Sequence, residues 1–227
     1  MAKFSNAFIK TKLSKMPKNK VIVTYPGRFQ PPTKNHYNAF LSLKEAFGIE
    51  PIVTTSNKIE KGRSPFTFEE KKLIWKKMFG VKRVEQVKLP YSPVEVLSKY
   101  PDDALWIVGL GEKDAERLDN WADLISIDSA TSKTLIPWSE KRTPRCRGCS
   151  GVYYIIPLQK DSFKGKMISG TTVRETFRNG TNKEKKDMFV LMYGKMNDEI
   201  YNLINDRLSN LDEGVDWDLS ELDFWTE

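Results

Sequence analysis

The sequence is poor in the residues that build disulfide frameworks and metal centres. Its 227 residues include two cysteines, Cys146 and Cys149, and one histidine, His36. The spacing Cys-Arg-Gly-Cys is that of half a zinc knuckle, but a tetrahedral zinc site needs four ligands. We therefore predict no metal site, and we expect free thiols in a reducing compartment.

Long apolar runs are also missing. No stretch is long and apolar enough to span a bilayer, and the N-terminus lacks the apolar segment of a secretory signal. We therefore expect a cytoplasmic protein with no membrane partner. The sequence has no internal repeat and no low-complexity linker. Its length and its 39% hydrophobic content fit one α/β domain with a small helical appendage.

The charge is unevenly spread. The formal net charge is +7, yet residues 209–227 hold seven acids and no base, so the preceding residues sum to +14. A basic body suits polyanionic ligands such as nucleotides or nucleic acid. We predict a basic N-terminal arm (1–19), a central α/β domain (20–180), C-terminal helices (181–208) and an acidic tail (209–227) that is mobile in isolation. Contact of the arm or the tail with nucleic acid or protein stays open.

Predicted strands alternate with predicted helices, which is typical of a parallel sheet with helices on both faces. Thr33 and Thr67 are placed to cap two helices, and Ser92 to open a capping box before a short third one. Residues 125–150 are expected to be irregular. The expected strands cover residues 21–25, 51–55, 83–89, 104–108 and 152–156, and the expected helices cover 34–47, 68–79, 112–124, 172–178 and, broken near Gly194, 183–208. The predicted fold class is therefore α/β, a Rossmann-like parallel sheet with a C-terminal helical extension.

The most informative string is Gly27-Arg-Phe-Gln-Pro-Pro-Thr-Lys-Asn-His36, between the first predicted strand and the first predicted helix. In a parallel sheet this is the carboxyl edge, where ligands bind. A helix N-terminus presents unpaired N–H groups and a partial positive charge, and both suit phosphate. Because His36 lies in the first turn of that helix, we expect it at a phosphate site.

This string resembles the signature of the nucleotidyltransferase superfamily, Gly-x-Phe-x-Pro followed by (His/Thr)-x-Gly-His. Thr33 stands at the first histidine position, where threonine is an accepted variant. Asn35 stands where the family has a glycine. That glycine lets the backbone approach the nucleotide closely. A second family signature, Ile-Ser-x-Thr-x-x-Arg at a helix start, is matched by residues Ile168-Ser-Gly-Thr-Thr-Val-Arg174. Each motif alone is a weak signal, but the two together, in this order, are fairly specific.

The resemblance is greatest to the nicotinamide mononucleotide (NMN) adenylyltransferases, which carry the same residues as Gly27–Pro31. A segment of that branch is also similar to Ser64–Thr67. A loop found across the family, after the fourth strand, is similar to Gly109–Asp114. The resemblance implies transfer of AMP from ATP to a phosphate-bearing acceptor, most closely NMN to give NAD, with release of pyrophosphate. Cytidylyl transfer, phosphopantetheine-type adenylyl transfer and a non-catalytic binding or structural protein on the same fold remain alternatives.

The resemblance also implies roles for single residues. His36 is expected to donate a hydrogen bond to phosphate oxygens in the transition state, assisted by Thr33 and Lys34. Mg²⁺ is expected to enter with ATP and to need few protein ligands. The expected partners are a nucleoside triphosphate and a small phosphorylated acceptor. The expected nucleotide-binding residues are Gly27, Arg28, Phe29, Gly109, Ser169, Thr171 and Arg174, and the expected acceptor-binding residues are Arg63 and Asp114.

Overall fold

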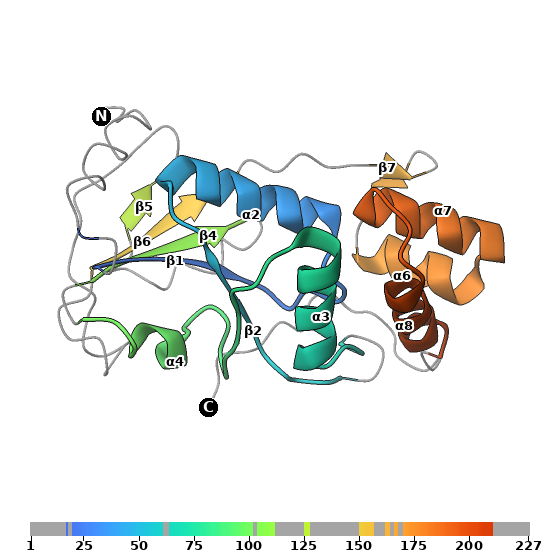
Figure 1. The fold of residues 1–227 in the computed structure, drawn as a ribbon, viewed down its shortest axis with the longest axis horizontal. Helices are drawn as coiled ribbons and strands as arrows, with labels where there is room; N and C mark the ends of the chain where they lie inside the picture. Colours follow the sequence, from blue (N-terminus) through green and yellow to red (C-terminus); the bar gives the residue numbers. More distant parts are fainter. Residues whose placement is uncertain are drawn as a thin grey trace.

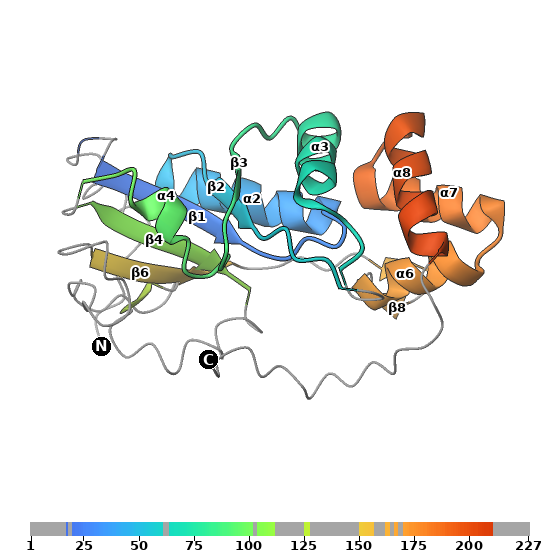
Figure 2. The same cartoon turned by 90° about the horizontal axis from the view of Figure 1, so that it is seen from below.

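The computed structural model describes residues 17, 20–60, 64–101, 104–111, 125–127, 150–156, 162–163, 166–167 and 170–210. Within them, six parallel strands form one sheet in the order β3-β2-β1-β4-β6-β5 (Figures 1 and 2). The strands are β1 (Val21–Pro26), β2 (Ile52–Thr55), β3 (Val84–Gln86), β4 (Leu105–Leu110), β5 (Ile125–Ile127) and β6 (Ser150–Ile155).

The strand order reverses at the centre of the sheet. Strand β1 pairs with β2 on one side and with β4 on the other, with Tyr25 opposite Val53 and Val23 opposite Ile107. In open parallel sheets, ligands bind at the carboxyl edge beside such a reversal. The segment that follows β1 therefore starts at the edge where a ligand is expected.

Helices cover both faces of the sheet. Alternate β1 residues point to opposite sides, so Val21 and Val23 pack with helices α2 (Lys34–Phe47) and α3 (Phe68–Phe79). Ile22 instead packs in a second core with the short helix α4 (Val94–Leu97). The two layers are visible in Figure 1 and, from below, in Figure 2. The predicted Rossmann-like fold is confirmed.

A C-terminal helical unit packs beside α3. It consists of α6 (Gly170–Asn179), α7 (Asn182–Tyr193) and α8 (Asp198–Ser209), and the short antiparallel strands β7 (Ser162–Phe163) and β8 (Lys166–Met167) precede it. A third core joins this unit to α3; it consists of Phe66, Ile74, Met78, Val173, Phe177, Met188, Phe189, Met192, Tyr193, Ile200, Ile204 and Leu208. The predicted break near Gly194 is also present, since this residue ends α7 with a φ of 74°.

The two helices nearest the candidate site begin and end where the sequence predicts. Thr67 caps α3 in a capping box with Glu70, whose carboxylate accepts from the Thr67 N–H at 2.8 Å. Gly48 ends α2 in the left-handed conformation, with a φ of 66°. Strong capping signals therefore fixed these boundaries.

Two local predictions are wrong. Ser92 does not cap α4: the N-cap residue is Pro93, and the Glu95 carboxylate accepts instead from the Lys88 N–H at 2.9 Å. Residues 125–127 form β5 rather than irregular structure, because the outer edge of β6 supplies a partner for their backbone. The strand predicted over residues 83–89 is shorter, covering Val84–Gln86.

Several predictions lie outside the described residues: most of the basic arm, the helix at 112–124, the Cys146/Cys149 pair and the acidic tail beyond residue 210. The division into an arm, a domain, C-terminal helices and a tail therefore stays a prediction. In the part of the chain that is described, none of the helices combines the length and the apolar character needed to cross a membrane.

Candidate functional site

His36 is held by the residue that caps its own helix. The Thr33 backbone N–H donates to His36 Nδ1 at 3.0 Å, and Thr33 Oγ1 lies 2.9 Å from the same nitrogen. A backbone N–H can only donate, so Nδ1 carries no proton and the neutral ring keeps its proton on Nε2. Burial lowers the pKa of His36 from 6.5 to about 4. The ring is therefore a neutral Nε2–H donor at pH 7.

Phe29 supports the histidine ring from below. Its side chain is 4% exposed, and its backbone is left-handed with a φ of 48°. The Phe29 ring meets His36 edge-on at 5.2 Å and Trp75 edge-on at 5.3 Å between centroids. A Cβ atom on Gly27 would lie 2.6 Å from Phe29 Cζ, so glycine is required there. Because the ring is buried, the nucleotide contact predicted for Phe29 can be made only by its backbone.

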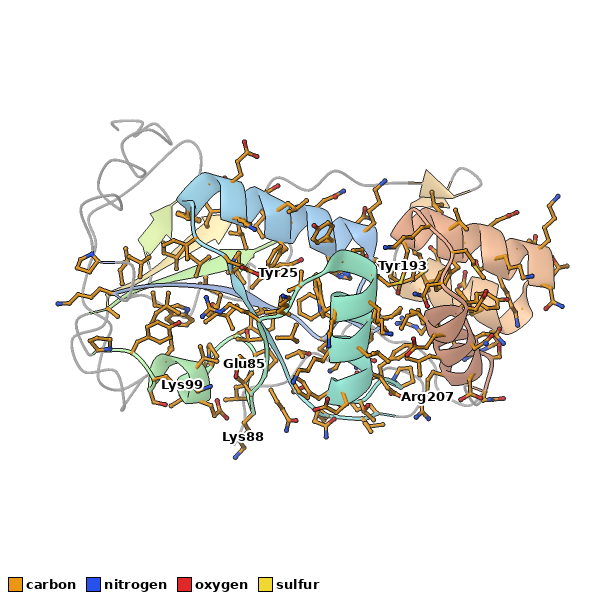
Figure 3. All side chains as sticks on the ribbon, viewed as in Figure 1. Tyr25, Glu85, Lys88, Lys99, Tyr193 and Arg207 are labelled. Carbon is orange, nitrogen blue, oxygen red and sulfur yellow. The ribbon has the colours of Figure 1, made fainter. Side chains whose placement is uncertain are left out.

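The rest of this loop is tied to its neighbours. The Gln30 carboxamide donates to the Phe66 carbonyl at 3.2 Å and accepts from the Phe66 N–H at 2.9 Å. The Tyr193 hydroxyl donates to the Pro32 carbonyl at 2.8 Å, and Tyr193 is labelled in Figure 3 where α2 meets the C-terminal helices. These contacts come from the segment just before α3 and from the end of α7. The loop between β1 and α2 is therefore fixed before any ligand arrives.

Two cations flank His36 at the surface. Arg28 follows the motif glycine, and Lys34 is the first residue of α2; both side chains are exposed. Among the described residues, neither forms an ion pair. Both are thus available to an anion at the N-terminus of α2, where the helix dipole adds to their attraction.

The second motif lies at the start of α6. Thr171 is exposed, and Arg174 Nη2 donates to its hydroxyl at 3.4 Å. A Cβ atom on Gly170 would lie 3.1 Å from Arg174 Nη1, so the guanidinium bends back over the helix start. Ser169, which completes the motif, lies outside the described residues. The described half of this motif is an exposed helix N-terminus with an arginine above it.

Other predicted site residues have a packing role or are not described. A Cβ atom on Gly109 would lie 2.3 Å from Leu43 Cδ1, so this glycine lets α2 pack closely on β4. Its nucleotide contact stays a prediction. The predicted acceptor-binding residues Arg63 and Asp114 lie outside the described residues.

Sequence reasoning missed Lys71, a lysine of α3 that is 1% exposed. Its ammonium donates to Thr55 Oγ1 at 3.0 Å and to the Ser56 carbonyl at 2.5 Å. Burial lowers the pKa of Lys71 to about 8. The signal was present in the sequence, since Phe68, Lys71 and Trp75 follow the spacing of the buried helix face.

The described residues offer little to a metal ion on its own. They contain no group of three His, Cys, Asp or Glu side chains close enough to hold one. The described polar groups around His36 are instead cations, hydroxyls and amides. This donor set fits phosphate, and a divalent ion that arrived with a polyphosphate would be held chiefly by the phosphate oxygens.

Comparison with known proteins identifies the family. A search of the curated proteins finds no match. Residues 24–176 match the cytidylyltransferase-like family, which is well over half of the chain. This segment includes the loop that ends at His36 and the motif that ends at Arg174. The chain therefore belongs to the cytidylyltransferase-like family, and its general activity is that of a nucleotidyltransferase.

Proposed function

We propose that this nucleotidyltransferase transfers AMP from ATP to a phosphate-bearing acceptor, with NMN as the leading candidate and NAD and pyrophosphate as products. The observation that carries the proposal is the neutral His36 ring, held by Thr33 so that Nε2–H is the donor. The preference for ATP and NMN rests on the resemblance of Gly27–Pro31 to the NMN adenylyltransferases.

The reaction needs no covalent intermediate with the protein. An oxygen of the acceptor phosphate attacks the α-phosphorus of ATP in line. A new P–O bond forms while the bond from the α-phosphorus to the bridging oxygen breaks, and pyrophosphate leaves with that oxygen. Catalysis is then positioning plus stabilisation of charge on phosphate oxygens. His36 stabilises that charge by donating Nε2–H, without giving up its proton.

Arginine and lysine side chains neutralise the triphosphate in this proposal. Arg28 and Lys34 approach it from the first motif, and Arg174 approaches it from the start of α6, where Ser169 and Thr171 can also donate. Thr33 acts mainly through His36, because its hydroxyl lies against the histidine ring. Magnesium bound to the phosphates supplies further charge neutralisation. Arg63 and Asp114 are proposed to bind the acceptor.

The test is a matrix of ATP and CTP against NMN, phosphopantetheine and simple phospho-alcohols, with pyrophosphate release and product mass as readouts. We expect a product with ATP and NMN. A product from another pair would keep the transferase activity and replace the proposed substrates. If no pair gives a product, the catalytic proposal fails and a binding role on the same fold gains support.

Cytidylyl transfer is the second candidate, and membership of the cytidylyltransferase-like family is compatible with it. Asn35 bears instead on the alternative of a non-catalytic protein on the same fold, because it replaces the family glycine and its buried Oδ1 has no hydrogen-bond partner in the described structure. A carboxamide at this position narrows the space in which a nucleotide can approach the helix start. The CTP arm of the matrix separates cytidylyl transfer from adenylyl transfer.

A further inference from the structure

Lys71 is a buried cation that the proposed mechanism does not use. Its side chain enters the space between α3 and the end of β2, where the ammonium donates to two neutral oxygens, Thr55 Oγ1 and the Ser56 carbonyl. Such oxygens satisfy N–H donors but do not balance the charge. A buried ammonium is costly unless a negative group compensates it. The position therefore calls for a counter-ion.

The described carboxylates next to Lys71 on α3 do not provide one. Glu70 accepts from the Thr67 N–H and is ion-paired with Arg207 at 2.6 Å, whereas Glu69 is exposed. Figure 3 labels Arg207 beside the first turn of α3, where Glu70 lies. Among the described residues, no ion pair of Lys71 is present. The charge of Lys71 is thus left uncompensated in this part of the chain.

The ammonium lies under the carboxyl edge of the sheet. Its partner Thr55 is the last residue of β2, and Thr55 Oγ1 also reaches the Arg28 carbonyl at 3.5 Å. The preceding residue, Thr54, accepts from the Gly27 N–H at 3.1 Å. Two polar contacts through Thr55 Oγ1 therefore link the Lys71 ammonium to the Arg28 carbonyl, in the loop between β1 and α2.

We propose that Lys71 supplies a buried positive charge to the phosphate-binding site, and that the polyphosphate of the substrate is its counter-ion. This inference rests on the proposed function and deepens it. Charges interact more strongly through a protein interior than through water, so a buried ammonium acts on an anion several ångströms away. An exposed lysine on the same helix is screened by solvent and salt.

Three variants test the proposal, with magnesium pyrophosphate binding at pH 7 measured by calorimetry. Lys71→Gln removes the charge and keeps a donor for Thr55 and Ser56, whereas Lys71→Arg keeps the charge. Lys72→Gln is the matched control, because Lys72 is the exposed neighbour and carries the same charge. We expect Lys71→Gln to weaken binding about tenfold, and Lys71→Arg and Lys72→Gln to change it less than about threefold.

Equal affinities of the Lys71→Gln and Lys72→Gln variants would overturn the inference and leave the proposed function standing. A wild-type protein that binds no pyrophosphate would overturn both. A second measurement needs no variant: in protein carrying ¹⁵N at the lysine side chains, pyrophosphate is expected to shift the Lys71 ammonium resonance more than that of Lys72. An unmoved Lys71 resonance in pyrophosphate-bound protein would also overturn the inference.

Discussion

The two motif helices begin in very different surroundings. At the start of α2, His36 is bonded to Thr33, Phe29 is buried beneath the ring, and Tyr193 reaches the preceding loop from α7. At the start of α6, Thr171 is exposed, and Arg174 reaches it through a long contact of 3.4 Å. The first site is built into the core, and the second is at the surface.

We infer from this difference that the first motif stabilises the transition state and that the second binds the nucleotide. A donor that stabilises charge in a transition state must be held in place beforehand, because reorganisation during the reaction costs free energy. A cation that neutralises the outer phosphates acts at longer range and tolerates movement. We therefore expect substitutions around α2 to affect stability and turnover, and substitutions at the start of α6 to affect nucleotide affinity.

The largest expected effect is on stability. Phe29→Ala removes a buried ring that contacts Tyr25, His36 and Trp75, so we expect a loss of about 3–5 kcal/mol in the free energy of unfolding. Urea denaturation measures it. Thr171→Ala is the matched change at the other motif and should cost less than about 0.5 kcal/mol. Similar losses in both variants would remove the distinction between a buried and an exposed motif.

The pH dependence of stability should also report on His36. Its pKa is about 4 in the folded protein against 6.5 for a free side chain, so below pH 6.5 the unfolded chain takes up a proton that the folded one does not. Stability should fall by about 3 kcal/mol between pH 7 and pH 4 from this residue alone, and this contribution should level off below pH 4.

Denaturation across this pH range in wild type and in His36→Gln isolates that contribution. Glutamine at the third helical position can still accept from the Thr33 N–H, as in an ordinary capping box. Carboxylates such as Glu70 titrate in both proteins and cancel in the difference. Identical pH profiles for the two proteins would show that the histidine is not buried in its neutral form.

Turnover should depend on His36 more than on any residue of the second motif. His36→Ala removes the Nε2–H donor, and we expect kcat to fall by about 10²-fold, as for other losses of a single oxyanion donor. Pyrophosphate release under saturating substrates measures it, and a thermal melt checks folding. A variant that turns over at the wild-type rate would contradict the role of His36.

The smallest effect is expected at the exposed motif. Arg174→Ala should raise KM for the nucleoside triphosphate by about tenfold and leave kcat within about threefold, because the arginine binds ground state and transition state alike. Lys186→Ala, on the exposed face of α7, is the control for the loss of one positive charge. A fall in kcat with unchanged KM would mean that Arg174 acts in the transition state, as proposed for His36. It would contradict the proposed difference between the two motifs.

Sequence patterns were most reliable where the determinants are local. The bounds of α2 and α3 follow from Thr33, Thr67 and the terminal glycines, since capping depends on residues within one turn. Ser92 had the same pattern, yet Glu95 bonds to the Lys88 amide in the loop before it. Strand β5 has too few residues to stand out, and its pairing with β6 depends on residues far along the chain.

The site divides along the same line. The two motifs and their order were sufficient to predict a phosphate site at a helix start, because the residues within each motif are close in sequence. The support for His36 could not be predicted, because Trp75 and Tyr193 reach the loop from distant helices. Gly109 illustrates the limit: it is needed for close packing against Leu43 of α2, a residue that neither motif includes.

The sequence alone determined the alternation of strands and helices, the ends of α2 and α3 and the residues predicted to bind phosphate, because each depends on periodicity or on neighbours within a turn. Only the tertiary structure decided which of these residues are preorganised. Packing against distant elements lowers the pKa of His36 and places the Lys71 ammonium in the interior beneath the sheet edge. Desolvation is a property of the packed whole, so a string of residues does not specify it.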